Sequence, residues 1–173
     1  MKTINLTPIP LTSEDFSLFG EVVDSRGGSF MTINDGYARK YANLATIDTQ
    51  EADGTTAVHI FVARKRQFPL RINMLEKHPF FSQAFIPRST QPFVVVVAPP
   101  SETPNIEKIQ AFITDGEQGV NYARGVWHFP LISLGNDNQF ITIDRKHNGH
   151  SDTLEQCVIF PINKVEINLR AST

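Results

Sequence analysis

The stretch Phe93-Val94-Val95-Val96-Val97-Ala98 is the longest apolar run in the chain and decides the class of fold. It is too short to cross a membrane, which takes roughly 20 apolar residues, but it has the length of a strand. β-Branched side chains such as valine are restricted in rotation and pack well on a pleated sheet. We therefore predict a buried strand here.

Segments of the same kind lie on both sides of this run. Each is short, rich in Val, Ile, Phe or Thr, and bounded by Pro, Gly, Asn or Asp, as is typical of strands between turns. The other predicted strands are 56–63, 69–75, 82–87, 110–114, 140–143 and 153–160. Many short strands with few helical periods predict an all-β sandwich or barrel.

The remaining local signals are few. Thr12, followed by two acidic residues, predicts the start of a short helix, and Gly20 is expected to end it. The glycine-containing segment 24–30 is expected to be a loop, and Gly116-Glu117-Gln118-Gly119 a turn, because the lysine of a phosphate-binding loop is absent. Residues 144–152 predict an exposed loop before a last strand.

Composition limits the class of protein. A chain of 173 residues suits one domain, 1–173, and 40% apolar with 20% charged residues is ordinary for a soluble protein. The net charge of −2, without a basic block, argues against a nucleic-acid partner. No secretory signal or membrane span is evident, and the single Cys157 fits a reducing compartment. We therefore expect a cytoplasmic protein with no membrane partner.

Two clusters of side chains carry the chemistry. Glu76 and His78 share one side of a strand, since alternate residues of a strand point the same way. Gln83 can return to them across a hairpin, and His128 can reach them from a distant strand. A carboxylate, an amide and two imidazoles form a ligand set suited to a divalent transition metal.

The spacing of these clusters resembles the cupin signature. The first cupin motif is H-x-H-x4-E, and Glu76-x-His78-x4-Gln83 keeps its spacing with two changed residues. The second motif ends P-x-G-x2-H, and Ala123-x-Gly125-x2-His128 keeps its glycine and histidine. The resemblance implies a cupin-like double-stranded β-barrel (jelly roll) with one or two short helices and the site in the barrel mouth. The changed residues alter the softness of the ligands.

A closer resemblance, from about the first helix to Arg145, is to the ureidoglycolate lyase family. The segments of this chain that carry the resemblance are INDG (33–36) with Arg39 and Tyr41, LEKHPFFSQAFIP (75–87), FVVVVAPP (93–100), AFITDGEQGVNYARGVWHFPL (111–131) and FITIDR (140–145). The resemblance implies a carbon–nitrogen lyase that cleaves (S)-ureidoglycolate to glyoxylate and urea in allantoin and purine degradation. It also implies a homodimer and a Ni²⁺ cofactor.

The implied reaction requires specific groups. A base removes the hydroxyl proton, a donor assists the departing urea nitrogen, and a cation or amide holds the carboxylate. The predicted catalytic residues are His128, His78 and Glu76. The two histidines are expected to act as base and acid, and the sequence does not decide which of them is the base. The predicted metal ligands are Glu76, His78, Gln83 and His128. The predicted substrate-binding residues are Arg64, which would clamp the carboxylate, and Asn34, Asn121, Tyr122 and Gln83.

Some of these side chains also have simpler structural explanations. Gln83 can simply satisfy backbone groups, and Glu76 can pair with a neighbouring cation at a rim. His59 is expected to be a packed core histidine, and His147 and His150 to be exposed. The rival functions are a ureidoglycolate hydrolase that releases ammonia, a different cupin enzyme such as a dioxygenase or isomerase, and a non-catalytic cupin that binds a small molecule.

Overall fold

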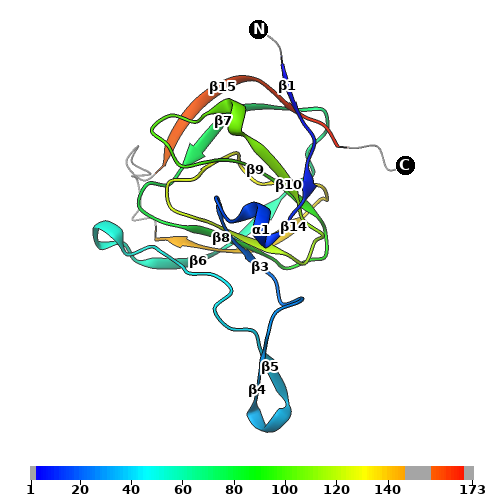
Figure 1. Ribbon diagram of the computed structural model, residues 1–173, viewed down its shortest axis with the longest axis vertical. Coiled ribbons are helices and arrows are strands. Elements are labelled where there is room, and N and C mark those ends of the chain that lie inside the picture. Colours follow the sequence, from blue (N-terminus) through cyan, green and yellow to red (C-terminus); the bar gives the residue numbers. More distant parts are fainter. Residues whose placement is uncertain (1–2, 147–156, 170–173) are drawn as a thin grey trace.

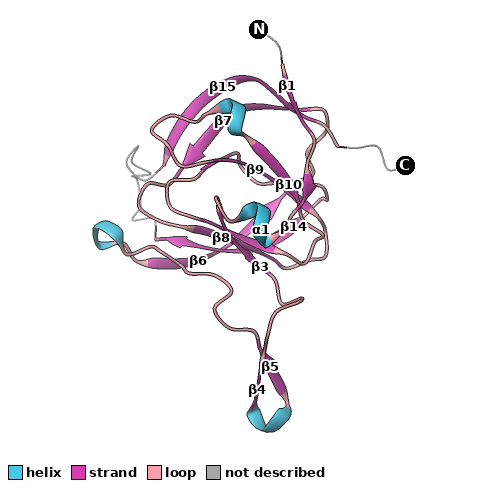
Figure 2. Cartoon of the chain, in the orientation of Figure 1, coloured by secondary structure: helices cyan, strands magenta, loops and turns pink. Residues whose placement is uncertain are grey.

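The computed structural model describes residues 3–146 and 157–169. Figures 1 and 2 show two curled sheets that enclose a barrel, with a thin hairpin projecting from it. Strands dominate and helices are confined to short turns. This confirms the predicted all-β barrel. None of the helices in the described ranges is long and apolar enough to span a membrane.

The larger sheet has eight strands. In spatial order they are β1 (Ile4–Leu6), β15 (Val158–Ile167), β7 (Leu70–Lys77), β12 (Trp127–His128), β9 (Phe93–Ala98), β10 (Gln110–Ile113) and β2 (Ile9–Pro10), with β13 (Ile132–Ser133) also pairing with β9. The pairs that concern the site, β7 with β12 and β12 with β9, are antiparallel.

The smaller sheet has five strands. In spatial order they are β3 (Gly20–Val23), β11 (Gly119–Tyr122), β8 (Gln83–Pro87), β14 (Asn138–Arg145) and β6 (Thr56–Ala63). All four pairs in this sheet are antiparallel. Among the described residues, β6 pairs only with β14 and therefore forms one edge of the sheet.

Strand β9 is buried along its whole length, as its sequence predicts. Alternate side chains divide between two cores, because successive residues of a strand point to opposite faces. Phe93, Val95 and Val97 belong to the core between the two sheets, and Val94, Val96 and Ala98 to a second core on the other face. This strand thus joins the barrel interior to the packing of β7 and β15 behind it.

The short helix α1 (Ser13–Phe16) begins as predicted. The Thr12 hydroxyl accepts a hydrogen bond from the backbone N–H of Asp15 and caps the first turn. The helix ends before Gly20, so the prediction that Gly20 ends it is wrong. Gly20 instead opens β3 with φ +143°, where it lies so close to the carbonyl of Asn121 that a Cβ atom would overlap it.

Other boundaries differ by a few residues. Strands β6 and β9 match their predicted ranges, whereas β7 continues to Lys77 and β14 extends through Arg145. The predicted exposed loop therefore begins too early, because Asp144 and Arg145 are buried at the end of β14. The rest of that loop from residue 147, with His147 and His150, and the first part of the predicted strand 153–160 lie outside the described residues.

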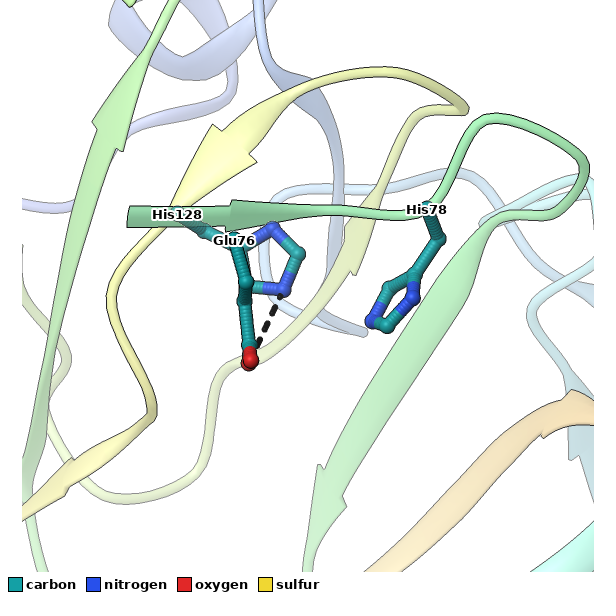
Figure 3. Close-up of side chains that lie close together, drawn as sticks. All are labelled: Glu76, His78 and His128. Carbon is teal, nitrogen blue, oxygen red and sulfur yellow. Dashed lines mark ion pairs between the residues drawn. The ribbon is translucent and has the colours of Figure 1, made fainter. Parts of the chain in front are cut away.

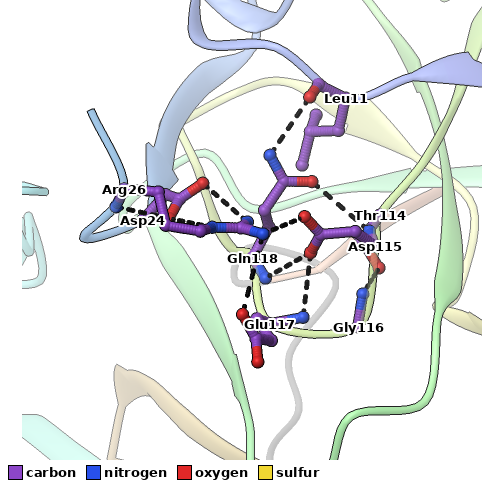
Figure 4. Close-up of polar contacts among 8 residues, drawn as sticks. All are labelled: Leu11, Asp24, Arg26, Thr114, Asp115, Gly116, Glu117 and Gln118. Atoms are coloured by element: carbon purple, nitrogen blue, oxygen red, sulfur yellow. Dashed lines mark hydrogen bonds and ion pairs between the residues drawn. The ribbon is translucent and has the colours of Figure 1, made fainter. Parts of the chain in front are cut away.

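The segment after β10 forms the predicted turn. The Asp115 carboxylate accepts hydrogen bonds from the backbone N–H groups of Glu117 and Gln118, and Arg26 pairs with both Asp115 and Asp24 (Figure 4). The Gln118 side chain also donates to the carbonyl of Leu11. These contacts hold the loop after β3 against the turn between β10 and β11.

The hairpin, here called the arm, was not predicted from the sequence. It consists of β4 (Met31–Ile33), the turn η1 (Asn34–Gly36) and β5 (Ala38–Lys40), and it projects away from the barrel (Figure 1). Two further short turns, η2 (Glu51–Asp53) and η3 (Ile106–Lys108), lie on connections.

Candidate functional site

Glu76, His78 and His128 lie close together (Figure 3). Their potential ligand atoms all lie within 4.8 Å of one another. Glu76 is near the end of β7, His78 follows this strand directly, and His128 lies in β12. The antiparallel register pairs His128 with Glu76, so the backbone itself places these two side chains side by side.

The His128 ring has a defined orientation. Its Nδ1 lies 3.0 Å from the carbonyl oxygen of Val126, which can only accept, so Nδ1 carries the proton and Nε2 carries the lone pair. His128 is 2% exposed, and its Nε2 has no hydrogen-bond partner among the described residues. The nearest acidic atom is Oε1 of Glu76 at 3.6 Å, which is too far for a hydrogen bond.

Burial sets the protonation of this pair. Burial, with a smaller contribution from the charge of nearby His78, lowers the pKa of His128 to about 3, although the bond to Val126 opposes the shift. Burial also raises the pKa of Glu76, opposed by the thiol of Cys157. His128 is therefore neutral at physiological pH, with the lone pair of Nε2 directed toward Glu76.

Aromatic rings fix both imidazoles. The Tyr122 ring stacks on His128 with 4.5 Å between ring centroids, and Phe81 stacks on His78 at 4.4 Å. The Tyr122 hydroxyl is buried, and burial, together with the charge of Glu76, raises the pKa of Tyr122 far above its ordinary value. Tyr122 therefore stays protonated and can donate a hydrogen bond.

The three side chains fit a divalent transition metal. They offer two imidazole nitrogens and a carboxylate oxygen, a donor set that suits Ni²⁺, Zn²⁺ and similar ions. A buried imidazole nitrogen with a lone pair and no hydrogen-bond partner in the described chain is what such an ion would satisfy. The bond from Nδ1 to a carbonyl is the usual support for a histidine ligand.

Gln83 lies on the facing sheet, at the start of β8 and in register with Tyr122. Its side-chain nitrogen donates to Oδ2 of Asp144 at 3.0 Å, so its amide is engaged by a buried carboxylate. The Nε2 atom of His59 lies 3.0 Å from the other oxygen, Oδ1. Gln83 thus belongs to a second polar group with Asp144 and His59, and its role as a metal ligand stays a prediction.

Three predicted substrate-binding residues are not brought to Glu76, His78 and His128. Asn121 points to the opposite face of β11 from Tyr122 and donates to Glu21 and to the carbonyl of Thr46. Asn34 lies at the tip of the arm. Arg64 follows the far end of β6, where it lines an exposed cleft of about 410 Å³. Their roles in substrate binding stay predictions.

The sequence interpretation missed three residues around the site. Asp144 and His59 were assigned to a loop and to the core, although His59 is 38% exposed. Alternation along β14 could have found Asp144, because it shares a face with Phe140 and Thr142. Cys157 donates through its thiol to Oε2 of Glu76 at 3.8 Å, a contact between distant strands that no local pattern indicates.

Comparison of the sequence with known proteins gives consistent matches. The family model described as ureidoglycolate lyase matches residues 3–166. Proteins named ureidoglycolate lyase are 44% identical over 151 residues in Pseudomonas paraeruginosa (87% of this chain, 88% of that protein) and 46% identical over 140 residues in Azotobacter vinelandii (81% and 84%). Among solved structures, the rmlC epimerase of Mycobacterium tuberculosis aligns with a TM-score of 0.41 and 16% identity, over 80% of this chain and 64% of that one.

Proposed function

The chain belongs to the ureidoglycolate lyase family, and we propose that it cleaves (S)-ureidoglycolate into glyoxylate and urea. The relatives that share this name span most of the chain. The structural observation that carries the proposal is the convergence of Glu76, His78 and His128, where the buried Nε2 of His128 has no hydrogen-bond partner among the described residues. Cleavage of this compound places the enzyme in allantoin and purine degradation.

The reaction is a balanced elimination that consumes no water. The bond between the hydroxyl-bearing carbon and the ureido nitrogen breaks, and its electron pair leaves with the nitrogen. The hydroxyl loses its proton as the carbonyl of glyoxylate forms, and the urea nitrogen gains one proton. Because no carbon is oxidised or reduced overall, the enzyme has to move one proton and stabilise charge on oxygen.

The chain offers groups for both tasks. Imidazoles exchange protons readily, and the described geometry leaves Nε2 of His128 as the ring atom that can accept one. The protonated hydroxyl of Tyr122, stacked on His128, can donate a hydrogen bond to a substrate oxygen. The Gln83 amide, held by Asp144, is a second polar group from the facing sheet. We assign substrate binding to Tyr122 and Gln83 within one chain.

We propose Ni²⁺, or a similar divalent ion, as a ligand of Glu76, His78 and His128, with Gln83 as the predicted fourth ligand. Such an ion, when bound, supplies Lewis-acid polarisation of the substrate hydroxyl and lowers its pKa. One nitrogen atom cannot bind a metal and accept a proton at the same time. Glyoxylate release that is lost after chelation and restored by Ni²⁺ assigns Nε2 of His128 to the metal, whereas unchanged release assigns it to proton transfer.

Arg64, Asn34 and Asn121 need a separate account. Arg64 follows the end of β6 and lines a cleft whose lining residues do not include Glu76, His78 or His128. Asn34, on the projecting arm, would act on a substrate bound by a neighbouring molecule. We keep both roles, and that of Asn121, as proposals to be tested by alanine substitution. We also propose a homodimer in the cytoplasm.

The experiment that tests the proposed function is a time course of glyoxylate release from fresh ureidoglycolate, corrected for spontaneous decay. A rate above the blank that disappears in His128→Ala supports catalysis at this site. A hydrolase would give ammonia in place of urea. Binding of ureidoglycolate without turnover would instead indicate a non-catalytic cupin.

A further inference from the structure

The outer face of β6 is apolar and open to solvent. Val58, Ile60 and Val62 alternate along the strand and are 67%, 56% and 55% exposed. The other face of the same strand is turned toward the barrel, where Ala63 is buried and Phe61, itself 44% exposed, packs against Phe85. An antiparallel sheet usually buries one face and solvates the other, so two apolar faces indicate a second covering layer.

The neighbouring strand extends this surface. In the antiparallel register, Ile143 of β14 lies opposite Val58, and Ile141 lies opposite Ile60. Paired residues of adjacent strands share a face of the sheet, so these five aliphatic side chains form one continuous strip. The strip has no charged member, and it therefore suits an apolar protein surface rather than an anionic ligand. We call it the β6 strip.

The arm is the second uncovered apolar surface. Its exposed side chains include Met31 at 52% and Tyr37 at 94%, and Phe30, which directly precedes it, is 45% exposed. In the part of the chain that the structure describes, β4 and β5 pair only with each other, and a lone two-stranded hairpin is marginally stable in water. The arm leaves the barrel between β3 and β6 and projects from the side where these strands lie (Figure 1).

We propose that a second copy of this chain covers both surfaces, with the arm of each copy packed on the β6 strip of the other. Every copy carries both an arm and a strip, so a two-fold axis satisfies the two surfaces at once and closes the assembly. A stable interface buries roughly 800 Å² per partner, contributed by about 20–30 residues, which the five-residue strip does not reach alone. The arm supplies the additional contact and covers the free edge of β6.

This assignment rests on the homodimer proposed above, and neither surface includes Glu76, His78 or His128. The test is sedimentation equilibrium of the full chain, wild type beside Ile60→Glu and Tyr37→Ser. The wild type is expected at twice the chain mass of 19.4 kDa. A carboxylate at the centre of an apolar interface is expected to weaken dimerisation at least about 100-fold, and loss of the Tyr37 ring roughly tenfold.

Ile106→Glu is the matched control, because Ile106 is also an exposed isoleucine, at 37%, but lies on η3 away from the strip. It is expected to remain dimeric. Circular dichroism checks that each variant is folded, and Tyr37, at the tip of the arm, leaves the barrel untouched. A monomeric wild type would overturn both the homodimer and the surface. A dimeric wild type with equally dimeric Ile60→Glu and Tyr37→Ser would overturn the surface alone.

Discussion

Glu76 and His128 are direct cross-strand partners in β7 and β12, and 3.6 Å separates Oε1 of Glu76 from Nε2 of His128. This separation is too long for a hydrogen bond, yet both atoms face His78. The lone pair on Nε2 is fixed there by the contact of Nδ1 with Val126. The two atoms are thus arranged to bind a third group between them.

His128→Ala is expected to lower kcat by roughly 10²–10⁴-fold, the usual contribution of a positioned acid–base group. Steady-state kinetics with ureidoglycolate checks this. Because His128 is buried and stacked on Tyr122, the thermal midpoint is measured alongside to confirm a folded protein. Near-normal turnover by a folded variant would remove His128 from the mechanism.

Glu76→Gln is expected to weaken binding of Ni²⁺ by at least about 100-fold, because a carboxylate that binds the ion directly contributes more than the 10–100-fold typical of residues that only support a ligand. Isothermal titration calorimetry with the metal alone measures this without reference to activity. Glu107→Gln, on the exposed turn η3, is the matched control and should bind as the wild type does. Equal affinities in all three proteins would place the metal elsewhere.

Asp144→Ala is expected to destabilise the protein by about 1 kcal/mol, because it leaves the half-buried amide of Gln83 without its acceptor. Urea denaturation gives the free energy of unfolding. The exposed Glu102, in the loop after β9, provides the control Glu102→Ala. If Gln83 contributes to the site, Asp144→Ala also raises KM for ureidoglycolate; an unchanged KM would limit Asp144 and Gln83 to a structural role.

Arg26 makes stability depend on pH. Its hydrogen bonds and charge lower the pKa of Asp24. Burial raises the pKa of Asp115, but the hydrogen bond and charge of Arg26, together with the backbone N–H groups of Glu117 and Gln118, outweigh burial and lower it. Carboxyls with a lowered folded-state pKa stabilise the protein above their ordinary value of 3.8, and this contribution is lost as pH falls through the folded-state values. The urea midpoint of Arg26→Ala should therefore lie slightly below that of the wild type at pH 7, and the difference should shrink below about pH 4. A constant difference would contradict this linkage.

Much of the fold could be predicted because its signals are local. The valines of β9 and the alternating residues of β6 encode strands by themselves, and both ranges match. Strands such as β1 and β12 are too short to carry a pattern and exist through their partners. The arm was missed because its strands, Met31–Ile33 and Ala38–Lys40, are likewise brief.

The site residues likewise fall into those that the sequence predicts and those that it does not. The cupin-like spacing predicts that Glu76, His78 and His128 meet, and the register of β7 and β12 brings them together. Asn121 and Tyr122 were both expected to bind substrate, but adjacent residues of a strand face opposite sides, so only Tyr122 faces the barrel. The contacts of Asp144 with Gln83 and His59 depend on cross-strand register, which sequence spacing does not encode.

The central claim is that this site performs an elimination that leaves urea intact. The most direct measurement is a complete product balance on purified protein with fresh ureidoglycolate, quantifying glyoxylate, urea and ammonia separately and subtracting spontaneous decay. The account predicts glyoxylate and urea in equal amounts, formed faster than in the blank and not by His128→Ala. Ammonia in place of urea, or no rate above the blank, would contradict it.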